Sequence, residues 1–210
     1  MKGSNKMEEK LVMKDLCRQR FEPAVDRVRE LMEGEFSNIL VVIDGMSASG
    51  KSTLGFYLKE LFDCNLFHMD DFFLQDYQRT KERLAEVGGN VDYERFREEV
   101  LEKILKQESV IYRPFDCKTR TIQGETEIMP KRLNIIEGSY SQHPYFSELY
   151  AHKDIVVCRI FTEISKEQQI ERIRNRNGEF MLKRFVEEWI PKENAYFEEF
   201  QVKEKSDMVL

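Results

Sequence analysis

Residues 39–53 read Ile39-Leu40-Val41-Val42-Ile43-Asp44-Gly45-Met46-Ser47-Ala48-Ser49-Gly50-Lys51-Ser52-Thr53. Gly45 and Gly50 precede Lys51 and Ser52 at the spacing of the phosphate loop, G-x-x-x-x-G-K-S. The glycines let the backbone turn tightly around an anion, so that its N–H groups and the N-terminus of the next helix point at phosphate oxygens. A chance turn is the alternative, but the buried type of strand before the loop and the helix-compatible residues after it are the context that the motif requires.

This loop is expected to bind the phosphates of ATP. Lys51 would reach the β and γ phosphates, and the Ser52 hydroxyl would coordinate Mg²⁺. The residues assigned to nucleotide binding are Gly45, Ser47, Ala48, Ser49, Gly50, Lys51, Ser52 and Thr53.

Length and composition favour a single domain of the α/β class. The 210 residues are 41% hydrophobic and 34% charged, and the net charge of -6 gives no basis for non-specific binding of nucleic acid. No apolar run reaches the roughly 18 residues of a membrane span, and residues 1–10 carry charges where a signal peptide needs apolar residues. We therefore expect no membrane contact and a cytoplasmic location. The four cysteines and three histidines are too scattered for a disulfide framework or a zinc site.

Residues 1–37 are expected to form a helical segment packed on this domain, and Pro23 is expected to divide it into two short helices. Further along, apolar positions at helical spacing predict an amphipathic helix over residues 96–105. Residues 121–128 suggest a hairpin around Gly124. The aromatic-rich helical region from residue 179 onward is expected to kink or split at Pro191.

Carboxylates stand at the ends of two predicted strands. Asp70 and Asp71 follow the short strand 65–68, and Glu137 ends the apolar strand 133–137. Ligands bind at the carboxyl ends of the strands of an open parallel sheet, where the phosphate loop also lies, so these acids could face a bound nucleotide. Glu137 could hold Mg²⁺ directly or through water. The alternatives are a helix-capping role, which suits Asp71, and an ordinary exposed residue for Glu137.

Arginines follow the predicted strand 155–161. Arg172 and Arg176 lie four residues apart on one face of a helix, a geometry that could grip phosphate oxygens if this helix closes as a lid. The alternative is a solvated charge run in which the arginines pair with Glu167, Glu171 and Glu179.

These residues together resemble the uridine kinase and phosphoribulokinase family of P-loop kinases. The matching segments cover most of the chain from residue 39 onward: 44–53, 68–73, 90–92, 136–138, 172–176 and 197–200. The resemblance implies a P-loop NTPase fold of the nucleoside and nucleotide kinase type, with a five-stranded parallel sheet flanked by helices and a helical lid at about residues 165–180. It also implies ATP-dependent phosphorylation of a hydroxyl on a small molecule.

Position by position, the resemblance assigns Asp70 as the general base and places Asp70, Ser52 and Glu137 at the magnesium site. It assigns Asp92 to the ribose hydroxyls, and it adds the lid arginines Arg172 and Arg176 to Lys51 as catalytic residues.

The base pocket departs from the family pattern. Nucleoside kinases of the family tend to present Tyr-Asp and then a histidine, whereas this chain has Phe115 and Asp116 followed by Lys118-Thr119-Arg120. Phe115 could still stack on a base, and Phe115, Asp116 and Arg120 are assigned to substrate binding. Without the histidine the base is not specified, and the added cations would suit a more anionic acceptor.

The preferred hypothesis is a uridine kinase-like enzyme that phosphorylates the ribose 5′-hydroxyl of a nucleoside. Kinases of the same group that act on pantothenate, ribulose phosphate or a nicotinamide-type riboside remain alternatives. A non-catalytic nucleotide-binding regulator is a further alternative, although it would not need a strand-end carboxylate to accept a hydroxyl proton. The sequence leaves homo-oligomer formation open.

Overall fold

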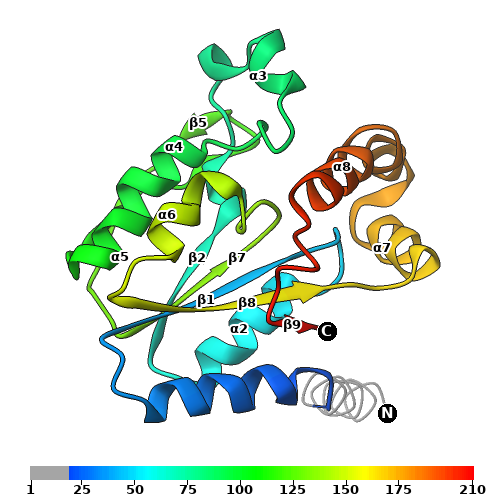
Figure 1. Cartoon of the computed structure of the whole chain (residues 1–210). Helices are drawn as coiled ribbons and strands as arrows, with labels where there is room; N and C mark the ends of the chain where they lie inside the picture. Colours follow the sequence, from blue (N-terminus) through cyan, green and yellow to red (C-terminus); the bar gives the residue numbers. More distant parts are fainter. Residues whose placement is uncertain (1–18) are drawn as a thin grey trace, which may run out of the picture.

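The computed structural model describes residues 19–210, and its centre is a parallel sheet of five strands (Figure 1). The strand order is β2-β7-β1-β8-β9, and each neighbouring pair is parallel. The strands are β1 (Asn38–Gly45), β2 (Cys64–His68), β7 (Leu133–Glu137), β8 (Ile155–Thr162) and β9 (Met208–Val209). The prediction of a five-stranded parallel sheet flanked by helices is therefore confirmed.

Alternate residues of β1 supply the cores on the two faces of the sheet. Ile39, Val41 and Ile43 belong to one cluster of buried residues, and Leu40 and Val42 belong to the other. This is the period of two that a strand buried on both faces imposes, and it explains why the stretch reads as one continuous apolar run.

The first of these faces is covered by residues 19–33, which are helical, and by α2 (Lys51–Leu61). Helix 19–33 runs on across Pro23, so the predicted division at this proline is wrong within the described residues; the remainder of that prediction concerns residues 1–18, outside the described range. A proline removes only one helical N–H donor. The packing of this helix on the sheet outweighs the one lost hydrogen bond. The buried apolar residues of the helix are Phe21, Ala24, Val25, Val28 and Leu31.

The opposite face is covered by one helical stretch that includes a π-helical turn: α4 (Tyr93–Phe96), η3 (Arg97–Leu101) and α5 (Glu102–Lys106). The amphipathic helix predicted over residues 96–105 is thus present. The short helices η4 (Pro144–Phe146) and α6 (Ser147–Tyr150) add to the core of this face.

The segment after α5 forms two small antiparallel ladders. Strand β3 (Val110–Tyr112) pairs with β6 (Thr126–Ile128), and β4 (Phe115–Asp116) pairs with β5 (Thr121–Ile122). The predicted hairpin around Gly124 is therefore wrong, because both of its strands pair with earlier segments of the chain instead of with each other.

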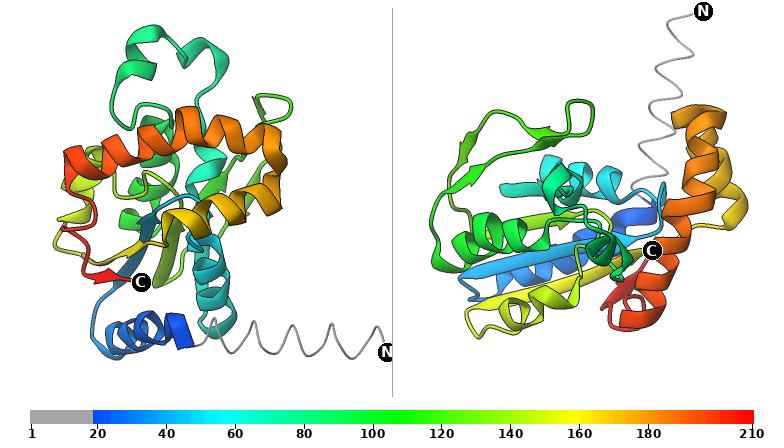
Figure 2. Two further views of the ribbon diagram at one scale, coloured as in Figure 1. Left: turned by 90° about the vertical axis from the view of Figure 1, so that its right-hand side faces the viewer. Right: turned by 90° about the horizontal axis from the view of Figure 1, so that it is seen from above.

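Helices stand over the carboxyl ends of the strands on two sides. On one side are η1 (Met69–Phe72), η2 (Asp76–Gln78) and α3 (Lys81–Ala85); on the other are α7 (Lys166–Arg184), η5 (Phe185–Trp189) and α8 (Ile190–Phe200) (Figures 1 and 2). The break in the α7–α8 arm lies at Gly178, with φ 77° and ψ 170°, and not at Pro191 as predicted. Pro191 lies in the first turn of α8, a position that tolerates its missing N–H.

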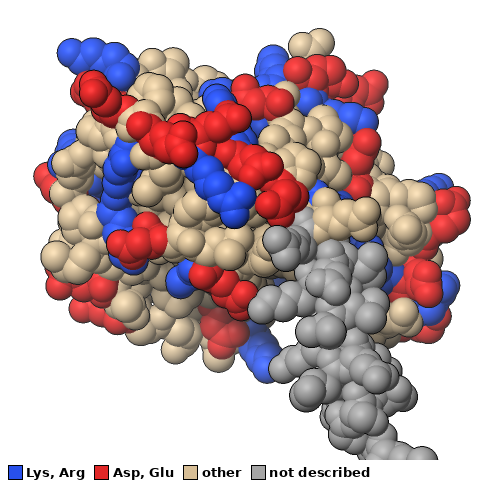
Figure 3. All heavy atoms as spheres, turned by 90° about the horizontal axis from the view of Figure 1, so that it is seen from below, with Lys and Arg blue, Asp and Glu red and all other residues tan. Residues whose placement is uncertain are grey.

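Between residues 19 and 210 there is no helix that is both long and apolar enough to cross a membrane. On the underside of the molecule lysines and arginines are interspersed with aspartates and glutamates (Figure 3). This face offers no broad positive surface of the kind that binds nucleic acid.

Candidate active site

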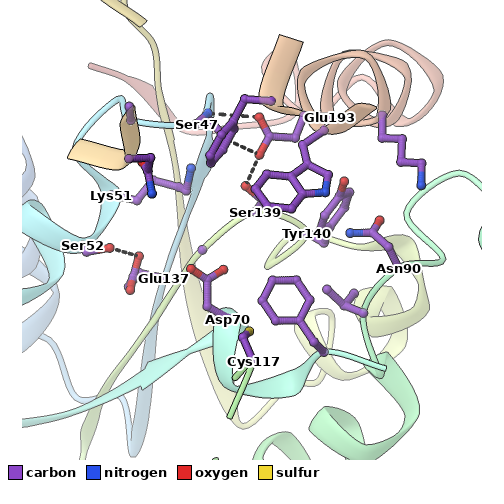
Figure 4. Close-up of a pocket in the computed structure, with 18 of the residues that line it drawn as sticks. Ser47, Lys51, Ser52, Asp70, Asn90, Cys117, Glu137, Ser139, Tyr140 and Glu193 are labelled. Carbon is purple, nitrogen blue, oxygen red and sulfur yellow. Dashed lines mark hydrogen bonds between the residues drawn. The ribbon is translucent and has the colours of Figure 1, made fainter. Parts of the chain in front are cut away.

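A cavity of about 1220 Å³ opens where the parallel strands end (Figure 4). Its walls come from the phosphate loop, the ends of β2 and β7, the segment 73–91 and the α7–α8 arm. Pockets for one small ligand usually measure about 300–1,000 Å³. The cavity is therefore larger than a usual site for one small ligand.

The backbone of the phosphate loop adopts conformations that favour glycine. Gly45 has φ 134°, and a Cβ atom there would lie 2.1 Å from the carbonyl oxygen of Thr162. Gly50, with φ 107°, leads directly into α2. Of the eight residues predicted to bind nucleotide, six line the cavity: Ser47, Ala48, Gly50, Lys51, Ser52 and Thr53.

The other two support the loop from behind. Gly45 donates its N–H to the buried Asp44 carboxylate at 2.7 Å. The buried Ser49 hydroxyl lies 2.5 Å from the Thr162 hydroxyl. Burial raises the pKa of Asp44 to about 6. The same carboxylate accepts a hydrogen bond from the Tyr196 hydroxyl at 2.9 Å, which lowers this pKa but does not offset the effect of burial.

Lys51 is folded over its own loop. Its ammonium group donates to the carbonyl oxygens of Gly45, at 2.7 Å, and Met46, at 2.9 Å. A cation is thus held within the ring of loop atoms where the phosphates of a nucleotide would bind. Both partners are neutral carbonyl groups, so neither of these hydrogen bonds is an ion pair.

Ser52 and Glu137, the residues expected to hold magnesium, face each other at the start of α2. The Ser52 hydroxyl donates to Glu137 Oε2 at 3.0 Å, and Glu137 is 4% exposed. Mg²⁺ in kinases is usually held by one or two protein oxygens together with substrate phosphates and water, and this pair fits that pattern. Within residues 19–210 no group of three histidine, cysteine, aspartate or glutamate side chains could hold a metal on its own.

His68 also contacts the predicted magnesium residue, a contact that the sequence did not indicate. Its Nδ1 lies 2.5 Å from Glu137 Oε1, and this hydrogen bond raises the pKa of His68. His68 and Glu137 are paired positions of the neighbouring strands β2 and β7. Only the strand register brings them together, so the separate segments gave no sign of it.

The two neighbouring aspartates after β2 have different surroundings. The Asp70 carboxylate projects into the cavity, and no described side chain donates a hydrogen bond to it (Figure 4). The enclosing protein, and then the Glu137 carboxylate, raise the pKa of Asp70. Asp71 is outside the cavity lining, and its Oδ2 accepts the hydroxyl of Tyr112 at 2.6 Å. Asp70 is therefore the carboxylate that is available to a ligand.

The predicted substrate residues separate into two groups. Phe115 and Arg120 line the cavity. Asp116 does not, because its carboxylate accepts the Lys118 N–H and the Thr119 hydroxyl within its own turn.

Asp92 also lies outside the cavity lining, although Asn90 and Val91 are part of it. It is buried at the N-cap of α4, where Oδ1 accepts the Arg95 N–H and Oδ2 accepts the Gln78 side-chain amide. A ligand hydroxyl would have to displace Gln78 to reach this carboxylate.

No function was expected for Cys117, one of the four scattered cysteines. It is exposed and lines the cavity close to Asp70 (Figure 4).

Both predicted lid arginines face the cavity. Arg172 donates to the carbonyl oxygen of Ala48 at 3.2 Å, and Arg176 is part of the lining. Arg174 is outside the lining and pairs with Glu179 at 2.5 Å. The charge-run interpretation thus describes Arg174, whereas Arg172 and Arg176 lie where they could contact phosphate.

Comparisons with known proteins agree with this fold. The chain is similar to a structure described as a possible uridine kinase from Bacillus stearothermophilus, with a TM-score of 0.65, 20% identity and coverage of 92% of this chain and 98% of the other. It is also similar to a candidate fructose transport system kinase from Silicibacter sp. TM1040, with a TM-score of 0.63, 24% identity and coverage of 83% and 90%. The chain therefore has the fold of the P-loop kinases.

One curated relative matches over a shorter segment. A shikimate kinase from Caldicellulosiruptor bescii is 28% identical over 71 residues, which is 34% of this chain. The match spans 41% of the length of that relative. No model of a protein family matches the chain.

Proposed function

We propose that this protein is an ATP-dependent kinase that transfers the γ-phosphoryl group to a hydroxyl of a small molecule. The observation that carries the proposal is the position of Asp70, a carboxylate without a hydrogen-bond partner among the described side chains, in the same cavity as the phosphate loop. A purely nucleotide-binding regulator would need the loop but not this carboxylate. The proposal therefore favours a catalyst.

In the proposed reaction the acceptor hydroxyl oxygen attacks the γ-phosphorus. A new O–P bond forms as the bond between the γ-phosphorus and the β–γ bridging oxygen breaks, and ADP leaves. Asp70 orients the hydroxyl and takes up its proton. Lys51, Arg172 and Arg176 stabilise the negative charge on the transferring group, as cations do in phosphoryl-transfer sites.

Mg²⁺, when bound with ATP, would neutralise charge on the β and γ phosphates. Ser52 and Glu137 are the residues that would hold it, and Asp70, which lines the same cavity, is a third candidate. The His68 hydrogen bond would fix the orientation of the Glu137 carboxylate.

For the acceptor we propose a ribose-bearing nucleoside whose 5′-hydroxyl is phosphorylated. Phe115 lines the cavity and offers a face on which a base could stack, and Asp92, once released by Gln78, could hold the ribose hydroxyls. The structure described as a possible uridine kinase adds weight to this choice.

One observation favours a second candidate acceptor, a hydroxyl compound that already carries an anionic group. Arg79 lines the cavity, and no described carboxylate pairs with its guanidinium group. Arg120 lines the same cavity from a different loop and pairs with Asp76. Two guanidinium groups in one cavity, one of them without a carboxylate partner among the described residues, would bind a phosphate or carboxylate better than a neutral sugar.

A coupled assay of ADP release tests the proposal. Nucleosides, sugars, sugar phosphates, hydroxy acids and pantothenate would be screened with Mg-ATP, and Lys51→Ala would be the control. We expect at least one acceptor to stimulate ADP release, and we expect Lys51→Ala to lower the rate by roughly a hundredfold or more, the usual effect of removing such a stabilising charge. Wild-type rates in Lys51→Ala would contradict the assignment of the phosphate loop.

A further inference from the structure

Glu193, in the first turn of α8, is a buried carboxylate bound to two different loops. Its Oε1 accepts the hydroxyls of Ser47, at 2.6 Å, and Ser139, at 2.7 Å, and its Oε2 accepts the Ser47 N–H at 3.1 Å (Figure 4). Glu193 is 6% exposed, and no described cation forms an ion pair with it. A buried charge of this kind is costly unless its hydrogen bonds are made, so all three contacts matter to its placement.

Glu193 joins two loops that both line the cavity of the proposed reaction site. Ser47 belongs to the phosphate loop, between Gly45 and Lys51. Ser139 follows β7 and comes two residues after Glu137, the predicted magnesium ligand. Both serines line the cavity, as Asp70 does. One carboxylate thus links the phosphate loop to the loop that directly follows the metal-site residue Glu137.

The preceding helix, α7, holds the same part of the phosphate loop by complementary contacts. Gln169 donates its side-chain amide to the carbonyl oxygen of Ser47 at 3.2 Å, and Arg172 donates to that of Ala48 at 3.2 Å. Helix α7 therefore supplies donors to loop carbonyls, whereas α8 supplies an acceptor to a loop N–H. The shape of the loop at Ser47 and Ala48 depends on both helices of the arm.

We infer that Glu193 is a positioning residue for phosphoryl transfer: it holds the phosphate loop and the loop after β7 at one separation, and it makes that arrangement depend on the docking of α8. The inference rests on the proposed kinase function. Misplacement of reacting groups by about 1 Å can lower a rate by about a hundredfold. A positioning role therefore predicts a loss in turnover that is larger than the loss in nucleotide affinity.

The first test separates turnover from binding in Glu193→Gln. The amide keeps the size of the side chain, but it has one acceptor oxygen in place of two, so it cannot accept the Ser47 N–H and both serine hydroxyls at the same time. We expect kcat with the best acceptor to fall by about 10- to 100-fold, and we expect the Kd for Mg-ATP to change by less than about threefold. Glu199→Gln is the matched control, because Glu199 is exposed on the same helix with no side-chain partner among the described residues; it should behave as wild type.

Ser139→Ala provides a milder second variant that removes a single hydroxyl. Its effect on kcat should be smaller than that of Glu193→Gln, and the double variant should lose less than the product of the two single effects, because both changes break the same contact. Wild-type kcat in Glu193→Gln would overturn the inference. A tenfold gain in ATP affinity with unchanged kcat would also overturn it, since Glu193 would then merely compete with phosphate for the Ser47 N–H.

A second readout needs no acceptor. Trp189 is the one tryptophan of the chain; it lines the cavity and lies one helical turn before Glu193. If Glu193 docks α8, acrylamide should quench Trp189 fluorescence more strongly in nucleotide-free Glu193→Gln than in wild type or Glu199→Gln. Equal quenching in all three proteins would refute the docking role. If the wild type phosphorylated no acceptor, the kinase proposal would fail, and this measurement would still decide whether Glu193 docks α8.

Discussion

Replacing Asp70 by Asn is the substitution that bears most directly on the proposed chemistry. The amide keeps the shape of the side chain but cannot take up the proton of an attacking hydroxyl. A positioned general base usually contributes about 10²- to 10⁴-fold to kcat, which corresponds to roughly 3–5 kcal/mol in the activation barrier. We expect a loss of this size in Asp70→Asn.

The stability of Asp70→Asn should not fall. No described side chain donates a hydrogen bond to this carboxylate, and the neighbouring Glu137 carboxylate disfavours its charge. Removing the charge breaks no described contact and relieves a repulsion. The free energy of unfolding should therefore be unchanged or slightly higher, and Mg-ATP should still bind.

Asp71→Asn is the matched control, and it should show the reverse pattern. Its Oδ2 accepts the Tyr112 hydroxyl at 2.6 Å, so losing the charge weakens a partly buried hydrogen bond. Such a change costs about 1–2 kcal/mol of stability, or a decrease in Tm of roughly 2–8 °C for a chain of this size. The effect on kcat should be less than about tenfold.

Both variants can be measured in one set of experiments: initial rates of ADP release with the best acceptor, thermal unfolding, and titration with Mg-ATP. The pH dependence adds a check, because only deprotonated Asp70 can accept a proton. Activity should fall as the pH drops through a pKa above the usual aspartate range. A large rate loss in Asp71→Asn with little loss in Asp70→Asn would mean that the base has been assigned to the wrong neighbour.

Three further predictions follow from other contacts. Gly45→Ala should destabilise the protein by more than about 3 kcal/mol in urea unfolding, because its Cβ would lie 2.1 Å from the Thr162 carbonyl oxygen; a loss below 1 kcal/mol would contradict this geometry. Arg172→Ala should lower kcat/KM for ATP by tenfold or more, whereas Arg174→Ala, which removes a surface pair with Glu179, should leave it within about twofold; equal effects would refute the assignment. Burial lowers the pKa of His143 from 6.5 to about 4, so as the pH falls this imidazole is protonated in the unfolded chain before it is protonated in the folded one. The free energy of unfolding should therefore decrease by about 2 kcal/mol between pH 7 and pH 5. His143→Phe should remove that part of the pH dependence, and an unchanged slope would contradict this role of His143.

The sequence was most informative where one local pattern determines the structure. The alternation hidden in the apolar run of β1, the spacing of Gly45, Gly50 and Lys51, and the acids after β2 and β7 all follow from short segments. Parallel strands bring their carboxyl ends to the same edge of a sheet, so the meeting of Asp70 and Glu137 with the phosphate loop could also be anticipated.

Predictions failed where the local sequence is compatible with more than one pairing, contact or break. The residues around Gly124 have the local signals of a hairpin, yet β5 and β6 pair with β4 and β3. Glu193 lies 146 residues from Ser47, and nothing near it in the sequence marks it as a partner of the phosphate loop. Pro191 and Gly178 are both helix-breaking residues, but the positive φ at the break can be adopted without strain by only the glycine.

The measurement that tests the proposed function most directly is the transfer of a labelled γ-phosphoryl group. ATP carrying the label would be incubated with Mg²⁺, the best acceptor and either wild type or Lys51→Ala, and the products would be separated and identified by mass spectrometry. The kinase proposal predicts that the label appears on a hydroxyl of the acceptor with the wild type and is almost absent with Lys51→Ala. Label recovered only as inorganic phosphate, or equal transfer by the two proteins, would contradict it.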